Sequence, residues 1–156
     1  FGFNVWDSFL FAVEDARAFN AEMGRPYGLW VVHNLKDFLF GAGLLSSAVF
    51  LAATAHRVGE LVGAVCKKES QRLWIILTEP ETVLSLSLAL VLVITDVIGV
   101  NRGETIRLWI FLAVFVQIIV ANRCAACARR WVFPALVALT LLQTAVTISI
   151  VGFVIP

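Results

Sequence analysis

Four long apolar runs constrain this chain more than any other feature of its sequence. They cover residues 38–55, about 80–100, 108–122 and 131–154. The first and the fourth have no charged residue, and the second carries Asp96 near its end. A helix needs about 20 mostly apolar residues to cross a bilayer, and lipid cannot satisfy exposed backbone groups. Each run is therefore expected to span a membrane as a helix.

The composition supports the same class. Hydrophobic residues make up 60% of the 156 residues and charged residues only 15%, which is unusual for a soluble domain. The formal net charge of +1 gives no reason to expect a nucleic-acid partner. We predict an all-α polytopic membrane protein, in which residues 25–156 form a four-helix transmembrane bundle. The predicted spans are about 30–56, 80–100, 105–122 and 131–155.

Residues 1–24 differ from these runs because apolar and charged residues alternate with helical spacing. Phe3, Trp6, Leu10 and Val13 recur every three or four residues, among several acids. This pattern predicts an amphipathic helix that lies in the membrane interface and does not cross it.

Basic residues predict the orientation. One side of the predicted bundle carries seven Lys and Arg residues: Arg57, Lys67, Lys68, Arg72, Arg123, Arg129 and Arg130. The other side carries five: Arg17, Arg25, Lys36, Arg102 and Arg107. By the positive-inside rule, the 101–107 turn and both termini are expected on the non-cytoplasmic side of an inner or plasma membrane.

The turn between the second and third spans is the main candidate site. Asn101 and Glu104 have the spacing of a capping box, which starts a helix. Arg102 and Arg107 add cationic donors beside a helix start, and this combination suits a phosphate group. Two interpretations stay open: a solvated turn, or a site for an anion or lipid phosphate. Residues Arg102, Glu104 and Arg107 would form that site.

Four polar residues on the same side could support this site. Asp96 is costly inside a membrane, so it is expected either to find Arg102 or Arg107 or to reach the interface. His33 and Asp37 are four residues apart, with Asn34 between them. They could relay a proton or bind a metal weakly, but packing and interfacial hydrogen bonds are the commoner use. We predict no catalytic residue, metal or cofactor, although haem or pigment binding stays open.

Three further features have ordinary and functional interpretations. Cys124 and Cys127 have the C-x-x-C spacing of thiol oxidoreductases, or they only pack at a helix end. Gln117 and Gln143 lie within spans, where interhelical hydrogen bonds are expected. Thr78 can cap the second span, with Glu81 reaching back to it.

The segment "VNRGETIRLWIFL" resembles a motif, R-G-E-x-x-R-x-W, of membrane glycosyltransferases of the GT-C class that use polyprenyl-phosphate sugars. "RPYGLWVVHNLKDFLFGAGL" and "LLQTAVTISIV" are similar to the helices before and after that motif. The resemblance implies that Arg102, Gly103, Glu104 and Arg107 lie near the lipid phosphate and bind without catalysing. The catalytic acid of that class lies in an earlier loop of a longer chain, and this sequence contains no such half.

Two functions therefore stay open, as does the question of whether the chain is part of an enzyme. The first is the non-catalytic C-terminal bundle of a lipid-linked-sugar glycosyltransferase. The second is an accessory or structural subunit of a larger respiratory or photosynthetic membrane complex. Membrane lipids are expected partners in both cases, and other membrane-protein subunits are expected in the second.

Overall fold

The computed structural model describes residues 4–99, 102 and 105–150, with the backbone alone for 105–108 and 150. This part of the chain is helical throughout and contains no strand. Its helices are α1 (Val5–Glu22), α2 (Tyr27–Gly41), α3 (Leu44–Cys66), α4 (Ser70–Thr78), α5 (Pro80–Ile98), α6 (Thr105–Ala126) and α7 (Val132–Ile150). The all-α prediction is confirmed.

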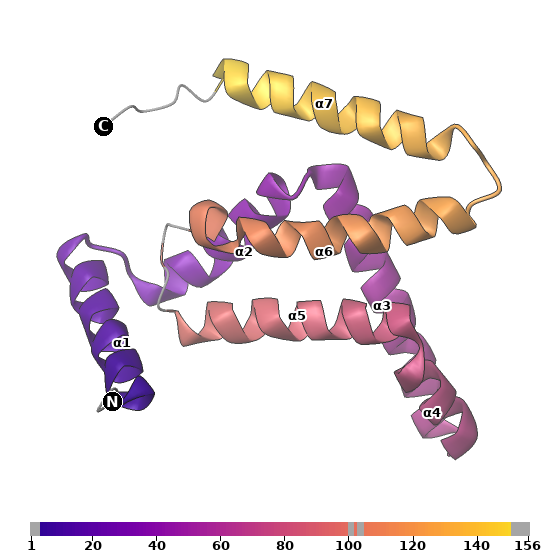
Figure 1. Cartoon of the computed structure of the whole chain (residues 1–156), viewed down its shortest axis with the longest axis horizontal. Helices are drawn as coiled ribbons and strands as arrows, with labels where there is room; N and C mark the ends of the chain where they lie inside the picture. The colour runs from indigo at the N-terminus through magenta and orange to yellow at the C-terminus, as the bar shows by residue number, and fades with distance from the viewer. Residues whose placement is uncertain (1–3, 100–101, 103–104, 151–156) are drawn as a thin grey trace.

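Four of the described helices are long and apolar enough to cross a membrane. The qualifying stretches are Leu44–Cys66, Pro80–Ile98, Trp109–Ala126 and Val132–Ser149. Helices α5, α6 and α7 run alternately back and forth (Figure 1), so the end of α5 and the start of α6 lie at one end of the molecule. The chain is therefore a membrane protein with four candidate spans.

The first predicted span, about 30–56, is not one helix. Helix α2 ends at Gly41, and α3 begins at Leu44 and continues to Cys66. Between them, Gly43 has a φ of +99°, in a region that residues with a Cβ rarely adopt. The two glycines around Ala42 are the sequence signal of this break, and only α3 has the composition of a complete span.

The core lies where α2, α3, α5 and α6 meet. Phe38, Phe50, Leu88, Trp109 and Val116 belong to one cluster of buried side chains. Helix α7 packs more loosely, because only 6% of its apolar stretch is buried. Its exposed apolar surface requires lipid or a protein partner.

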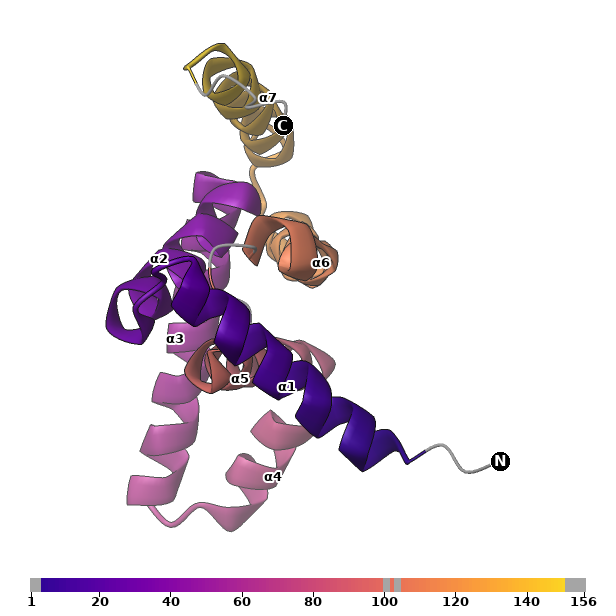
Figure 2. The ribbon, with the colours of Figure 1, turned by 90° about the vertical axis from the view of Figure 1, so that its left-hand side faces the viewer.

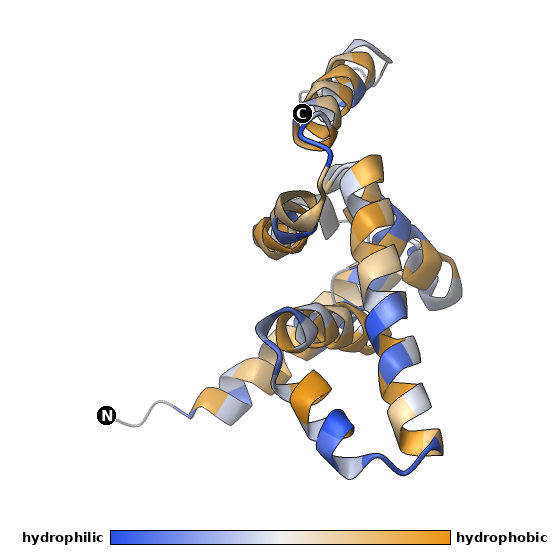
Figure 3. Ribbon diagram, turned by 90° about the vertical axis from the view of Figure 1, so that its right-hand side faces the viewer, coloured by the Kyte–Doolittle hydropathy of each residue, from blue (hydrophilic) through white to orange (hydrophobic). Residues whose placement is uncertain are grey.

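Two parts of the chain extend from this bundle. Helix α1 projects away from it, while α3 and α4 form a V beside the start of α5 (Figure 2). The side chain of Asn4 accepts a hydrogen bond from the Trp6 N–H at 3.0 Å, which caps α1. Hydrophilic residues gather toward the tip of the V, whereas α5, α6 and α7 are mostly hydrophobic (Figure 3). The placement of α1 in a membrane interface stays a prediction.

Candidate functional site

Two arginines that are far apart in sequence exchange hydrogen bonds where α5 ends and α2 begins. Arg25 Nη1 donates to the carbonyl oxygen of Arg102 at 2.5 Å, and Arg102 Nη1 donates to that of Arg25 at 2.8 Å. Arg102 Nε also donates to the Gly99 carbonyl at 2.9 Å, at the C-terminus of α5. We call this pair, Arg25 and Arg102, the arginine lock. It ties the α1–α2 turn to the end of α5.

Aromatic rings surround the arginine lock. The Arg102 guanidinium lies 5.2 Å from the centre of the Tyr27 ring, and that of Arg25 lies 5.1 Å from the centre of the Phe19 ring. Tyr27 is itself fixed, because its hydroxyl donates to the Val97 carbonyl at 2.7 Å. Gly99 has a φ of +64°, and a Cβ there would approach the Tyr27 ring to 2.5 Å. Glycine therefore permits both the turn and the close contact of the ring.

The charge of the arginine lock is not balanced by a nearby acid of the described residues. Neither Arg25 nor Arg102 forms an ion pair with a carboxylate in the part of the chain that the structure describes. Both side chains are partly buried, and the carbonyls that they contact are neutral. This end of the bundle consequently concentrates positive charge and guanidinium donors. Arg25 was recognised in the sequence only as a topology signal.

Asp96, three residues before Gly99 on α5, has a different partner from the one predicted. Its carboxylate is buried, with 6% of the residue exposed, and it is hydrogen-bonded by the side chain of Asn34. Arg102 turns instead to backbone carbonyls, so its predicted pairing with Asp96 is wrong. The pairing with Arg107 falls on a side chain outside the described residues, and the placement of Asp96 at the membrane interface stays a prediction. Among the described residues, Asp96 Oδ1 has no hydrogen-bond partner.

The remaining predicted site residues are not brought together in the described structure. Lys36 Nζ lies 3.2 Å from His33 Nδ1 and 3.7 Å from Asp37 Oδ1, so each residue of the predicted pair contacts the lysine. Glu104 and the side chain of Arg107 lie outside the described residues, as does the Asn101 cap. The described residues contain no group of three or more His, Cys, Asp or Glu that could hold a metal ion.

An ion-pair cluster at the other end of the bundle was missed in the sequence. Arg57 on α3 contacts three carboxylates, at 2.9 Å for Glu60, 2.5 Å for Glu79 and 3.4 Å for Glu81. Glu81 also pairs with Arg123 on α6. We call these five residues the ion-pair cluster. It joins α3, the start of α5 and the end of α6.

The sequence held only a partial signal for the ion-pair cluster. Arg57 and Glu60 are three residues apart on one helix face, but Glu81 was expected to take part in a cap. The predicted cap is wrong: Thr78 donates within α4, to the Trp74 carbonyl at 2.9 Å, and Glu79 occupies the N-cap position of α5 without a side-chain capping bond. Glu81 is thereby free to pair with the arginines of two other helices.

Two glutamines stabilise the break between α2 and α3. Gln117 Nε2 donates to the Ala42 carbonyl at 2.9 Å. Gln143 Nε2 donates to the Phe40 carbonyl at 3.1 Å, and its Oε1 accepts from the Leu44 N–H at 2.9 Å. The predicted interhelical use of both glutamines is confirmed. These bonds satisfy backbone groups that the break releases from the helix, which is required within a membrane.

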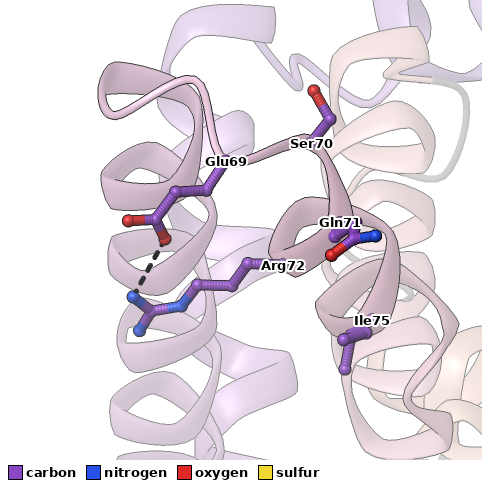
Figure 4. A pocket seen from close by; sticks show the side chains of 5 residues that line it. All are labelled: Glu69, Ser70, Gln71, Arg72 and Ile75. Atoms are coloured by element: carbon purple, nitrogen blue, oxygen red, sulfur yellow. Dashed lines mark hydrogen bonds and ion pairs between the residues drawn. The ribbon is translucent and has the colours of Figure 1, made fainter.

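A surface depression lies at the tip of the V formed by α3 and α4. It has a volume of about 520 Å³ and is lined by Glu69, Ser70, Gln71, Arg72 and Ile75 (Figure 4). Arg72 Nη1 lies 3.2 Å from Glu69 Oε2, so the charged groups of its wall neutralise each other. The depression contains none of the predicted site residues, and its composition indicates no particular ligand.

The C-x-x-C pair lies at the end of α6. Cys124 packs against the core, Cys127 is exposed, and both thiols are free. The Cys127 N–H donates to the Cys124 carbonyl at 3.1 Å, so the spacing also closes the last turn of the helix.

Comparison with known proteins assigns no family to this chain. No protein-family model, no curated protein and no solved structure matches it. Its function must therefore be inferred from its own geometry, and the arginine lock is the arrangement that best fits a ligand.

Proposed function

We propose that this membrane protein is a non-catalytic helical bundle that binds the phosphate of an anionic lipid at the arginine lock. The observation that carries the proposal is the approach of Arg25 and Arg102 without an acid of the described residues beside them. Two arginines at one turn leave positive charge there that a phosphate can neutralise. The expected ligand class includes polyprenyl phosphates.

The fixed geometry of the arginine lock favours binding. Each guanidinium already donates to a carbonyl, so less side-chain freedom is lost when it binds a ligand. These bonds use Nη1 and Nε, and in the proposed site Nη2 of each arginine binds a phosphate oxygen. Arginine is well suited to phosphate because its planar donors match the oxygen positions. Tyr27 and Trp30 are residue types that favour the headgroup layer.

The sequence resemblance supports the same ligand. Arg102 belongs to the R-G-E-x-x-R-x-W motif, which lies near the lipid phosphate in the glycosyltransferases that the segment resembles. By that resemblance, Glu104 and Arg107 would complete the site. The chain would then correspond to the C-terminal bundle of such an enzyme, facing the non-cytoplasmic side.

Lipid titration of the detergent-purified protein tests the proposal. Arg25→Gln and Arg102→Gln should each weaken the binding of a short-chain polyprenyl phosphate about tenfold, because each removes a charge-assisted hydrogen bond. Arg72→Gln is the matched control, since it removes an exposed arginine far from the arginine lock in sequence. Native mass spectrometry would count the bound lipids.

Two readouts separate loss of binding from loss of folding. Each variant should keep its helical circular dichroism, and Arg102→Lys, which keeps the charge but not the planar donors, should bind with intermediate affinity. Inorganic phosphate as competitor would show whether the headgroup alone is recognised. Equal lipid affinity of Arg25→Gln, Arg102→Gln and the control would contradict the proposal.

The exposed face of α7 favours a second function, that of an accessory subunit. Phe133, Leu139, Leu141 and Leu142 are each more than half exposed on this helix. A membrane partner could cover them, as could lipid. A spin label at Leu142→Cys in native membranes tests this function. If the protein is an accessory subunit, a partner should shield the label from oxygen dissolved in the lipid. A label that oxygen reaches freely would exclude a partner on this face.

A further inference from the structure

Beside the ion-pair cluster, the interior contains buried polar atoms that form no hydrogen bond with the described protein. Several buried side-chain atoms there have no hydrogen-bond partner among the described residues. They are Thr54 Oγ1 and Arg57 Nε on α3, Thr82 Oγ1 and Ser85 Oγ on α5, and Arg123 Nη2 on α6. Buried polar groups in proteins are nearly always bonded to protein or to ordered water.

The ion pairs bring together the three helices that carry these atoms. Glu81 contacts both Arg57 and Arg123. Ser85 is one turn further along the same face of α5, and Thr54 is one turn before Arg57 on α3. Ser85 and Thr54 therefore both lie one turn deeper in the bundle than the ion pairs.

The polar region is closed on its inner side and open on its outer side. Thr82 and Ser85 are fully buried, and the next inward-facing residues of α5 are Leu88 and Leu92, which belong to the apolar core. At the outer end, 41% of the Glu79 side chain and 32% of the Arg123 side chain are exposed. The polar atoms thus lie between partly exposed charged groups at the outer end and an apolar barrier at Leu88.

We propose that α3, α5 and α6 enclose an internal water site at this end of the bundle. Water molecules bind Thr82, Ser85 and Thr54 and bridge them to the free donors of Arg57 and Arg123. A buried water usually makes two to four hydrogen bonds, and this region supplies polar partners from three helices. Hydration also screens the three carboxylates and two guanidinium groups of the ion-pair cluster, which would be costly in a dry interior. The site admits water and small water-soluble molecules as far as Ser85.

Thiol labelling tests the depth of the water. In a protein whose Cys66, Cys124 and Cys127 are replaced by Ala, Ser85→Cys should react with a small cationic thiosulfonate at least about tenfold faster than Leu88→Cys, because thiol reactivity requires solvent access. The two positions are one turn apart on one face, so they form a matched pair. Equal, slow reaction at both positions would overturn the proposal.

A second variant keeps the proposal testable if the labelled proteins fold poorly. Thr82→Val has nearly the same shape and removes only the hydroxyl. If water binds that hydroxyl, the unfolding temperature of the variant in detergent should fall, since the water loses a partner. In a dry interior the same change would remove an unsatisfied hydroxyl and raise the unfolding temperature, which would refute the water site. Ser87→Ala, on the exposed face of α5, should leave it unchanged.

Discussion

The two ends of the bundle use arginine in opposite ways. In the ion-pair cluster, Arg57 and Arg123 face the carboxylates of Glu79 and Glu81 across three helices. In the arginine lock, the guanidinium groups face backbone carbonyls and aromatic rings. Both arrangements join elements that are distant in sequence.

The difference lies in the charge that remains. Carboxylates neutralise the arginines of the ion-pair cluster, so that end contributes mainly to the packing of helices. Carbonyls satisfy donors without neutralising charge, and no carboxylate of the described residues pairs with Arg25 or Arg102, which is why we propose that the arginine lock attracts an anion. Arginines that look equivalent in the sequence thus differ in whether the fold supplies their counter-charge.

The largest expected effect is a loss of stability when the ion-pair cluster is broken. Arg57→Leu should lower the free energy of unfolding by about 3 kcal/mol, because it leaves carboxylates without their main partner in a partly buried position. Detergent unfolding followed by tryptophan fluorescence would measure the change. Adding Glu79→Gln and Glu60→Gln to Arg57→Leu should recover part of the loss. No recovery would mean that packing of the side chain, and not charge, accounts for the effect.

The next largest effect is expected at the arginine lock. Gly99→Ala should cost about 2 kcal/mol, because the new Cβ strains a positive φ and collides with the Tyr27 ring. The ring cannot turn away freely, since its hydroxyl is bonded to the Val97 carbonyl. Tyr27→Phe tests that restraint: combined with Gly99→Ala it should reduce the added cost. Purely additive effects of the two changes would show that the tyrosine bond does not hold the ring.

Gln117 and Gln143, which bond to the break between α2 and α3, give an uncharged reference for both ends. Gln143→Leu should cost about 1 kcal/mol, because it leaves the Leu44 N–H and the Phe40 carbonyl without their glutamine partner. Its effect should not depend on salt, unlike that of Arg102→Gln on lipid binding. Unfolding measurements at two ionic strengths would test this. If the stability lost in Gln143→Leu depended on salt, the α2–α3 break would no longer differ from the two ends that carry arginines.

The smallest effect is expected at the exposed pair on the α3–α4 tip. Arg72→Gln should change stability by less than about 0.5 kcal/mol, because both side chains of its pair with Glu69 are at least 40% exposed. The unfolding midpoint in detergent would measure this small change in stability. A loss as large as that of Arg57→Leu would mean that exposure does not explain why the arginines differ.

Local patterns in the sequence predicted the helices well where the pattern was long. The three later spans, at about 80–100, 105–122 and 131–155, correspond to α5, α6 and α7. The prediction of the first span was wrong because average hydropathy is insensitive to Gly41 and Gly43, the two glycines that allow the break. Gln117 and Gln143 were expected to bond across helices, but the sequence could not show that both bond to the same break.

The candidate site was only partly predictable. Arg102 was singled out because it lies in a short charged motif. Arg25 and the ion-pair cluster were not, because Arg102 is distant from Arg25 in the chain, as Glu79 and Glu81 are from the arginines with which they pair. The sequence by itself determined the helical, membrane-embedded class, since backbone groups in lipid must be satisfied within helices. Only the tertiary structure decided which arginines are neutralised, because that depends on which helices bring carboxylates within reach.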